Sequence, residues 1–144
     1  MNKIFYLSLS LLLISCNPKV KKEDIPKLNG YWEINQVTFS TADTKDFKIN
    51  ETIDYFELQQ AQFDDKVVGF KQKVMPQFDG KFKTNNIKEA FKIIKKDNLF
   101  FIEYASKFGK REEEIVELQD SIFTIKNKHN VLYTYKKFKP FIFK

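Results

Sequence analysis

The sequence predicts an all-β domain, an antiparallel up-and-down β-barrel of eight to nine strands. Short segments in which apolar and polar residues alternate follow one another at nearly regular spacing from Gly30 to Lys136. The connections between them carry the Asn, Asp and Gly residues that tight turns prefer. No long amphipathic helix interrupts the series. A meander of this kind has to close on itself or cover its edges, and closure into a barrel does so most simply.

An export signal is expected before the barrel. Lys3 supplies one positive charge, and an apolar run from Ile4 to Ile14 follows, broken only by Ser8 and Ser10. This run is shorter than the roughly 20 residues that a membrane-spanning helix needs. A charged start, a short apolar middle and a small residue before the cleavage point are typical of a cleaved signal peptide, here residues 1–15.

The end of this run, Leu13-Ile14-Ser15-Cys16, resembles the lipobox of bacterial lipoproteins, and Cys16 is the only cysteine in the chain. The resemblance implies that Cys16 becomes the mature N-terminus and that acyl chains such as palmitate on it anchor the protein to a membrane of the cell envelope. Asn17 stands where an aspartate would mark retention, which favours the outer membrane, with the periplasmic or surface face left open. The alternative is an ordinary secretory signal followed by a chance cysteine.

Residues 16–28 carry two prolines and many charges without an apolar period, which predicts a flexible linker between lipid and domain. The barrel domain is expected over residues 29–140. Its strands are expected at 31–39, 52–58, 66–74, 81–83, 90–95, 99–104, 113–118, 121–126 and 131–136. Good helix formers over 110–118 and 57–63 weaken this assignment, and we expect the first of these segments to be a strand.

The segment 66–74 alternates most clearly. Val68 and Phe70 fall on one face of the expected strand, and Lys71 and Lys73 fall on the other. We therefore expect the apolar face to point into the barrel and the two lysines to lie in solvent.

The opening of the first strand, Leu28-Asn29-Gly30-Tyr31-Trp32-Glu33-Ile34, resembles that of lipocalin and lipocalin-like domains, whose Gly-x-Trp signature is matched by Gly30 and Trp32. Glycine lets the chain turn sharply into the strand, and tryptophan is large enough to plug the closed end of a small barrel. The resemblance extends to about Phe138 and implies a barrel that carries a small ligand. The family's later Thr-Asp-Tyr motif has no counterpart, because Ile53-Asp54-Tyr55 lies in the wrong place, and the last strand lacks the family's arginine.

Composition narrows the function classes. Sixteen Phe, six Tyr and one Trp supply a core, and the formal net charge is +6. With Cys16 acylated, no thiol remains for a disulfide. Arg111 is the only arginine, whereas proteins that read phosphates and base edges depend on arginine. We expect no nucleic-acid partner, and the basic surface suits an anionic membrane better.

Catalytic and metal chemistry is not indicated. His129, the only histidine, lies in a polar turn without metal-ligand spacing. The run Glu112-Glu113-Glu114 could suggest a cation site, but a solvated charge run is the preferred interpretation. No Gly-x-Ser-x-Gly motif and no glycine-rich phosphate loop occur. We expect neither an enzyme nor a cofactor or metal.

The remaining candidate site is the barrel interior. The aromatic and aliphatic residues on the expected inward faces are candidate contacts for a small apolar or amphipathic ligand: Trp32, Phe70, Phe91, Phe100, Ile102, Tyr133 and Tyr135. In a barrel of this size the same side chains could instead fill the interior. The alternative function is a non-catalytic interaction or structural module of the cell envelope, whose protein partner the sequence does not identify.

Overall fold

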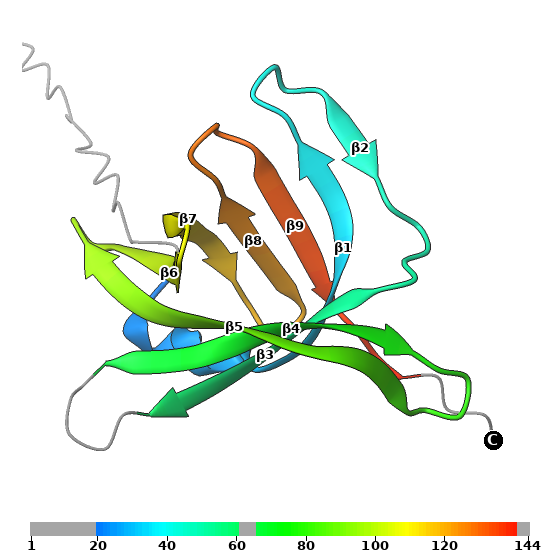
Figure 1. Ribbon diagram of the computed structural model, residues 1–144. Coiled ribbons are helices and arrows are strands. Elements are labelled where there is room, and N and C mark those ends of the chain that lie inside the picture. Colours follow the sequence, from blue (N-terminus) through cyan, green and yellow to red (C-terminus); the bar gives the residue numbers. More distant parts are fainter. Residues whose placement is uncertain (1–19, 61–65, 141–144) are drawn as a thin grey trace, which may run out of the picture.

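The computed structural model describes residues 20–60 and 66–140, which form a closed antiparallel barrel (Figure 1). A short 3₁₀ helix, η1, precedes nine strands. Their bounds are η1 Lys22–Leu28, β1 Gly30–Thr38, β2 Thr44–Asp46, β3 Ile53–Gln60, β4 Val67–Pro76, β5 Phe82–Lys96, β6 Leu99–Ser106, β7 Gly109–Leu118, β8 Ile122–Lys126 and β9 Leu132–Lys137. The up-and-down antiparallel barrel expected from the sequence is confirmed.

The sheet closes because β1 pairs on both of its edges. Its residues 32–38 pair with β9, while the opposite edge pairs with β3 at residues 30–32 and with β2 at residues 36–38. From β3 to β9, each strand pairs with the next strand in sequence. Eight strands therefore make the barrel, and β2 lies outside it as an addition to β1. Closure removes the unpaired edges that an open meander would leave.

Turn residues set where the strands reverse. Asp97 and Asn98 have φ angles of 50° and 63°, which two-residue hairpin turns need so that their twist matches that of the flanking strands. Bulges in β1, β5 and β7 shift the pairing register. Such bulges bend strands sharply enough for a small sheet to close. The strand β5 is longer than expected because it joins the expected segments 81–83 and 90–95 into one.

The segment before β1 closes one end of the barrel. Val20, Ile25 and Leu28 are buried in the hydrophobic core, and the Asp24 side chain accepts a hydrogen bond from the main-chain N–H of Lys21 at 2.9 Å. The expectation of a flexible linker is therefore wrong over residues 20–28, because these three apolar side chains bind the segment to the barrel. The expected signal peptide and Cys16 lie outside the described residues.

Trp32 is the centre of this closed end. Its ring is 0 % exposed, and its indole N–H donates a hydrogen bond to the carbonyl oxygen of Leu28 at 2.8 Å. The ring of Phe123 lies 5.5 Å away, and the Lys137 ammonium lies 4.4 Å above the indole. Trp32 thus joins helix η1 to β8 and β9.

Replacing Trp32 with alanine should lower the free energy of unfolding by about 3–5 kcal/mol, because truncation leaves a cavity in a packed core. Trp32→Phe should cost less, since it keeps most of the apolar contact and loses the hydrogen bond to Leu28. Denaturant titration followed by circular dichroism measures both. Phe108→Ala, at an exposed turn, is the control and should change stability by no more than about 0.5 kcal/mol. An unchanged midpoint for Trp32→Ala would show that the closed end does not depend on this ring.

Candidate functional site

The barrel interior is divided into a packed half and an open half. In the packed half, Phe91, Phe100 and Ile102 are buried with Trp32 in one hydrophobic cluster. These four candidate ligand contacts therefore fill the end of the barrel that helix η1 closes. Among them, Trp32 also borders a small hollow of about 220 Å³ between β1, β3 and β9.

Phe70 lies on the outside of the barrel, contrary to the expectation for segment 66–74. Its ring packs 6.1 Å from that of Tyr55 and lies 4.2 Å from the Lys88 ammonium. Alternation then turns Lys71 and Lys73 inward. The expected orientation is wrong because each lysine meets a carboxylate directly across the sheet: Lys71 is the register partner of Glu89 on β5, and Lys73 that of Asp54 on β3.

The open half contains a cavity of about 800 Å³. Its lining combines apolar, tyrosine and charged side chains: Phe56, Lys71, Lys110, Arg111, Glu112, Glu113, Ile125, Asn127, Lys128, His129, Tyr133 and Tyr135. Tyr133 and Tyr135, two of the candidate ligand contacts, thus line a cavity. His129 lies at the cavity mouth in the β8–β9 turn.

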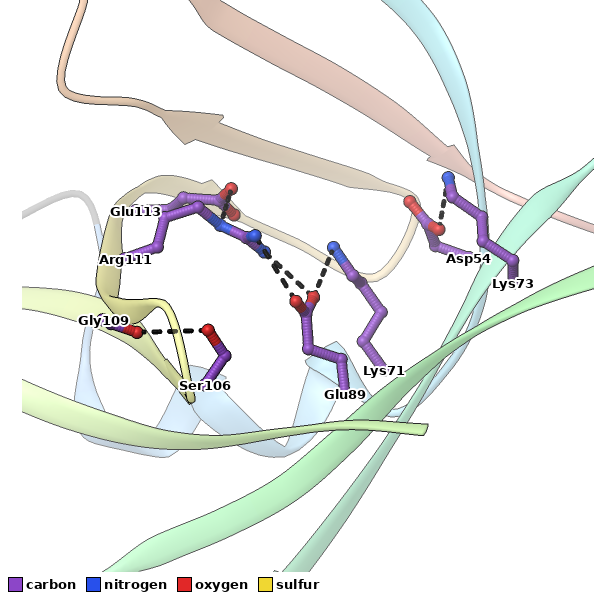
Figure 2. A network of polar contacts seen from close by, with 8 residues as sticks. All are labelled: Asp54, Lys71, Lys73, Glu89, Ser106, Gly109, Arg111 and Glu113. Carbon is purple, nitrogen blue, oxygen red and sulfur yellow. Dashed lines mark hydrogen bonds and ion pairs between the residues drawn. The ribbon is translucent and has the colours of Figure 1, made fainter. Parts of the chain in front are cut away.

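A network of ion pairs crosses the cavity wall (Figure 2). Arg111 on β7 holds both carboxylate oxygens of Glu89, with nitrogen–oxygen distances of 2.9 and 3.4 Å. The Lys71 ammonium lies 3.5 Å from the same carboxylate. The Nε atom of Arg111 lies 3.4 Å from Glu113 Oε1. Two cations and two carboxylates from three strands therefore neutralise one another inside the barrel.

Tyr104 on β6 supports this network from the core side. Its ring centroid lies 4.2 Å from the Arg111 guanidinium carbon and 4.8 Å from the Lys71 ammonium. Tyr104 and Arg111 are also direct register partners across β6 and β7. Contact of cations with a buried aromatic face is favourable because the ring face carries partial negative charge. The ring therefore separates the charged wall from the apolar half.

A second ion pair lies near Tyr135. The Lys73 ammonium is 2.6 Å from Oδ1 of the buried Asp54 (Figure 2). Burial, reinforced by the negative charge of Asp54, raises the pKa of Tyr135 well above its ordinary value. Its hydroxyl therefore stays protonated at any ordinary pH, and its side-chain hydrogen bond is to Asp54.

The pKa values of Glu89 and Glu113 are shifted in opposite directions. Burial raises the pKa of Glu113. Burial also acts on Glu89, but its hydrogen bond to Arg111 and the charge of Lys71 outweigh that effect and lower its pKa. Glu89 is therefore firmly ionised, whereas ionised Glu113 is only partly compensated.

Two buried polar atoms of this wall have no hydrogen-bond partner among the described residues. They are the hydroxyl oxygen of Tyr104 and Oε2 of Glu113. Leaving a buried polar group unpaired costs about 1–3 kcal/mol, and such groups are rare enough to need an explanation. Glu113 belongs to the cavity lining, whereas the Tyr104 ring lies behind it against Arg111.

The acidic run on β7 is expected from the sequence to be a solvated face, but only the Glu112 side chain, 36 % exposed, fits this, since those of Glu113 and Glu114 are 13 % and 15 % exposed. Glu112 pairs with Lys96 at 2.6 Å and Glu114 pairs with Lys126 at 2.7 Å, whereas Glu113 points into the cavity. The inward direction of Glu113 could have been predicted from the alternation along the strand, which puts Arg111 and Glu113 on one face with the buried Ile115.

Two further features concern metals and membranes. Within the described ranges, no group of three or more His, Cys, Asp or Glu side chains is arranged to hold a metal ion. In the same part of the chain, no helix combines the length and apolar character needed to cross a membrane.

No protein-family model and no curated protein matches the sequence. Among solved structures, the chain is similar to a lipocalin-like protein from Bacteroides uniformis ATCC 8492, with 13 % sequence identity and a TM-score of 0.45. The match covers 78 % of this chain and 99 % of that one.

The pH dependence of stability tests the state of Glu113. A carboxyl group whose pKa is raised on folding makes the folded state bind the proton more tightly, so stability falls as pH rises above the ordinary value of 4.5. Glu113→Gln should therefore melt at a higher temperature than the parent at pH 8, and this difference should vanish towards pH 4. Thermal unfolding across this range measures it. Glu112→Gln, in an exposed ion pair, is the matched control and should change little. A melting temperature lowered equally at every pH would contradict the assignment.

Proposed function

We propose that the barrel binds one small amphipathic molecule in its open half. The observation that carries this proposal is the cavity of about 800 Å³ with apolar side chains and two unpaired buried polar atoms on or beside its wall. Ligand cavities commonly measure about 300–1,000 Å³ and combine an apolar lining with a few polar groups that orient the ligand. The role proposed is binding without catalysis.

The apolar part of the ligand would lie against Phe56, Ile125, Tyr133 and Tyr135. These side chains come from β3, β8 and β9 and line the cavity together. Phe56 and Ile125 also belong to the hydrophobic core, so the cavity floor is continuous with it. Transfer of apolar surface onto this floor contributes roughly 25 cal/mol per Å².

The polar part would meet Glu113, Arg111 and Tyr104. Lys71 and Arg111 are already balanced by Glu89 and Glu113, so a neutral head group fits this wall better than a charged one. Glu113 Oε2 needs a donor, and the Tyr104 hydroxyl can either donate or accept. We therefore propose a head group with at least one hydroxyl or amide hydrogen-bond donor.

Calorimetric titration of the full chain carrying Cys16→Ser tests the proposal. The panel is a monoacylglycerol, a long-chain alcohol, a fatty acid and an uncharged apolar dye. We expect saturable binding with one site per chain, tightest for the molecules with hydroxyl head groups. Glu113→Gln should weaken it about tenfold or more, because a hydrogen bond to a charged group contributes about 1.5–3 kcal/mol. Glu114→Gln, on the same strand but outside the cavity lining, and Phe70→Leu should leave it unchanged.

Two results would count against the proposal. Absence of saturable binding across the panel would favour the alternative of an envelope interaction or structural module. Binding of the apolar dye that Glu113→Gln does not affect would assign the cavity to apolar ligands and remove the polar wall from recognition.

We also propose that the protein is anchored in the cell envelope by lipid on Cys16, with the outer membrane as its location. The support is the lipobox resemblance of Leu13-Ile14-Ser15-Cys16 and the absence of any other cysteine in the sequence. Several acyl chains, each burying methylene groups at about 0.8 kcal/mol apiece, hold far more firmly than one.

Cys16→Ser should leave the precursor uncleaved or release the protein from the membrane fraction. Fractionation with gel mobility, and labelling with radioactive palmitate, distinguish these states. Asn17→Ser, at the neighbouring position, should still be acylated. A Cys16→Ser protein that matures normally and stays membrane-bound would contradict lipid anchoring at this residue.

A further inference from the structure

The small hollow beside β1 lies where this strand changes partners. On one edge, β1 pairs with β3 over residues 30–32 and with β2 over residues 36–38, so residues 33–35 have no partner strand there. The main-chain N–H of Phe47 donates a hydrogen bond to the carbonyl oxygen of Asn35 at 2.9 Å. This bond holds the segment after β2 against β1, and the hollow of about 220 Å³ is lined from both sides.

Aromatic rings form much of the wall of this hollow. Four of them line it: Trp32, Phe47, Tyr133 and Tyr135. The two tyrosines also line the larger cavity, whereas Trp32 and Phe47 do not. A volume of about 220 Å³ lies below the range of about 300–1,000 Å³ that is usual for drug-sized ligands. The hollow therefore suits a molecule with one ring or a short chain.

Asp54 and Lys73 are the charged residues that line the hollow within the described part of the chain. The Asp54 side chain is 2 % exposed, and its Oδ1 atom lies 2.6 Å from the Lys73 ammonium (Figure 2). The Lys73 side chain is 59 % exposed. A carboxylate buried to this extent needs a cation beside it, because an unpaired buried charge is strongly destabilising. The lysine itself is free to turn into solvent once another cation takes its place.

We propose that the hollow binds a small organic amine in its cationic form, and that the ligand ammonium replaces Lys73 at Asp54. Exchange of one cation for another keeps the carboxylate compensated. A neutral or anionic molecule in the same place would leave Asp54 without a partner or keep Lys73 in the hollow. The apolar part of the amine packs against the aromatic wall, where Trp32 and Phe47 supply ring surface.

The charges around the rings fix the direction in which the amine lies. The Lys137 ammonium already lies 4.4 Å from the Trp32 ring centroid, so a second cation at this ring would be repelled. The Tyr135 hydroxyl forms a hydrogen bond with Asp54. The ligand ammonium therefore belongs between Asp54 and Tyr135, whose ring face also favours a cation, and the apolar part points towards Trp32.

Glu103 is the other carboxylate residue that is buried in the described ranges, at 6 % exposed. Two lysines lie beside it, Lys92 at 3.1 Å and Lys110 at 3.8 Å. The hollow next to it measures about 440 Å³, and Phe91 is the one aromatic residue among its described lining. An amine at Glu103 would have to compete with two cations and would find little aromatic wall. Glu103 and Lys92 therefore provide a matched control pair.

The fluorescence of Trp32 tests the proposal directly, because this residue is the only tryptophan in the chain and it lines the hollow. The full chain carrying Cys16→Ser is titrated at neutral pH with phenethylamine, with the uncharged 2-phenylethanol and with the anionic phenylacetate. We expect a saturable change in Trp32 emission with phenethylamine. The affinity for 2-phenylethanol should be lower by roughly tenfold or more, because the alcohol cannot compensate the buried carboxylate. Phenylacetate should give no response.

Two substitutions separate the cation exchange from simple apolar binding. Lys73→Met should tighten phenethylamine binding roughly tenfold, because the ligand then meets no competing ammonium and compensates a carboxylate that has lost its ion pair. Asp54→Asn should abolish the response. Lys92→Met removes the corresponding lysine from Glu103 and should leave the Trp32 response unchanged. Circular dichroism verifies folding of each variant, and the tightening in Lys73→Met decides the matter even where Asp54→Asn does not fold.

Three results would overturn the proposal: equal affinity for phenethylamine and 2-phenylethanol, binding by Lys73→Met that is no tighter than that of the parent, or full binding by a folded Asp54→Asn protein. Glu113→Gln should leave phenethylamine binding unchanged, since Glu113 does not line this hollow. The probe, the carboxylate and the reporter all differ from those that test the larger cavity. A failure at this hollow and a failure of amphipathic binding are therefore separate results.

Discussion

Pairing of β1 with β9 is the constraint on which the rest of the structure depends. Once that pairing closes the sheet, each of the eight barrel strands has two neighbours, and each of their side chains is assigned to the inside or the outside. The assignment gives the barrel an inner face that has to be either filled or neutralised. One half of the barrel interior is filled by aromatic packing around Trp32, and the charges in the other half are neutralised by ion pairs around Arg111.

The charged half depends on the register of the strands. Lys71 with Glu89, Lys73 with Asp54, and Tyr104 with Arg111 are each direct partners across neighbouring strands. A slip of one residue in any of these strands would turn one partner to the outside and leave a buried charge without compensation, which is strongly destabilising. The ion pairs thus help to select one register, together with the apolar side chains, which the same slip would also turn outwards.

Much of the fold could be predicted from the sequence, because alternation and turn residues are local signals. The antiparallel strands and the inward Tyr133 and Tyr135 follow from them. Which face of a strand turns inward is not a local property, and this is where the prediction for Phe70 and Lys71 failed. The partner that makes an inward Lys71 acceptable, Glu89, lies on the next strand, and only the register shows that the two meet. The packing of helix η1 was missed for a similar reason, since Ile25 and Leu28 are too few to form an apolar period.

Closure of the barrel also bears on how the chain folds. The β1–β9 pairing joins Trp32 to Lys137, residues more than 100 positions apart in the sequence. The loop entropy of such a contact has to be overcome before the contact contributes any stability, so folds dominated by long-range strand pairing form slowly. Until β9 has been made, β1 presents an unpaired strand edge, and such an edge can pair with other chains. The last strand to be synthesised is therefore the one that ends the period in which this chain is prone to aggregate.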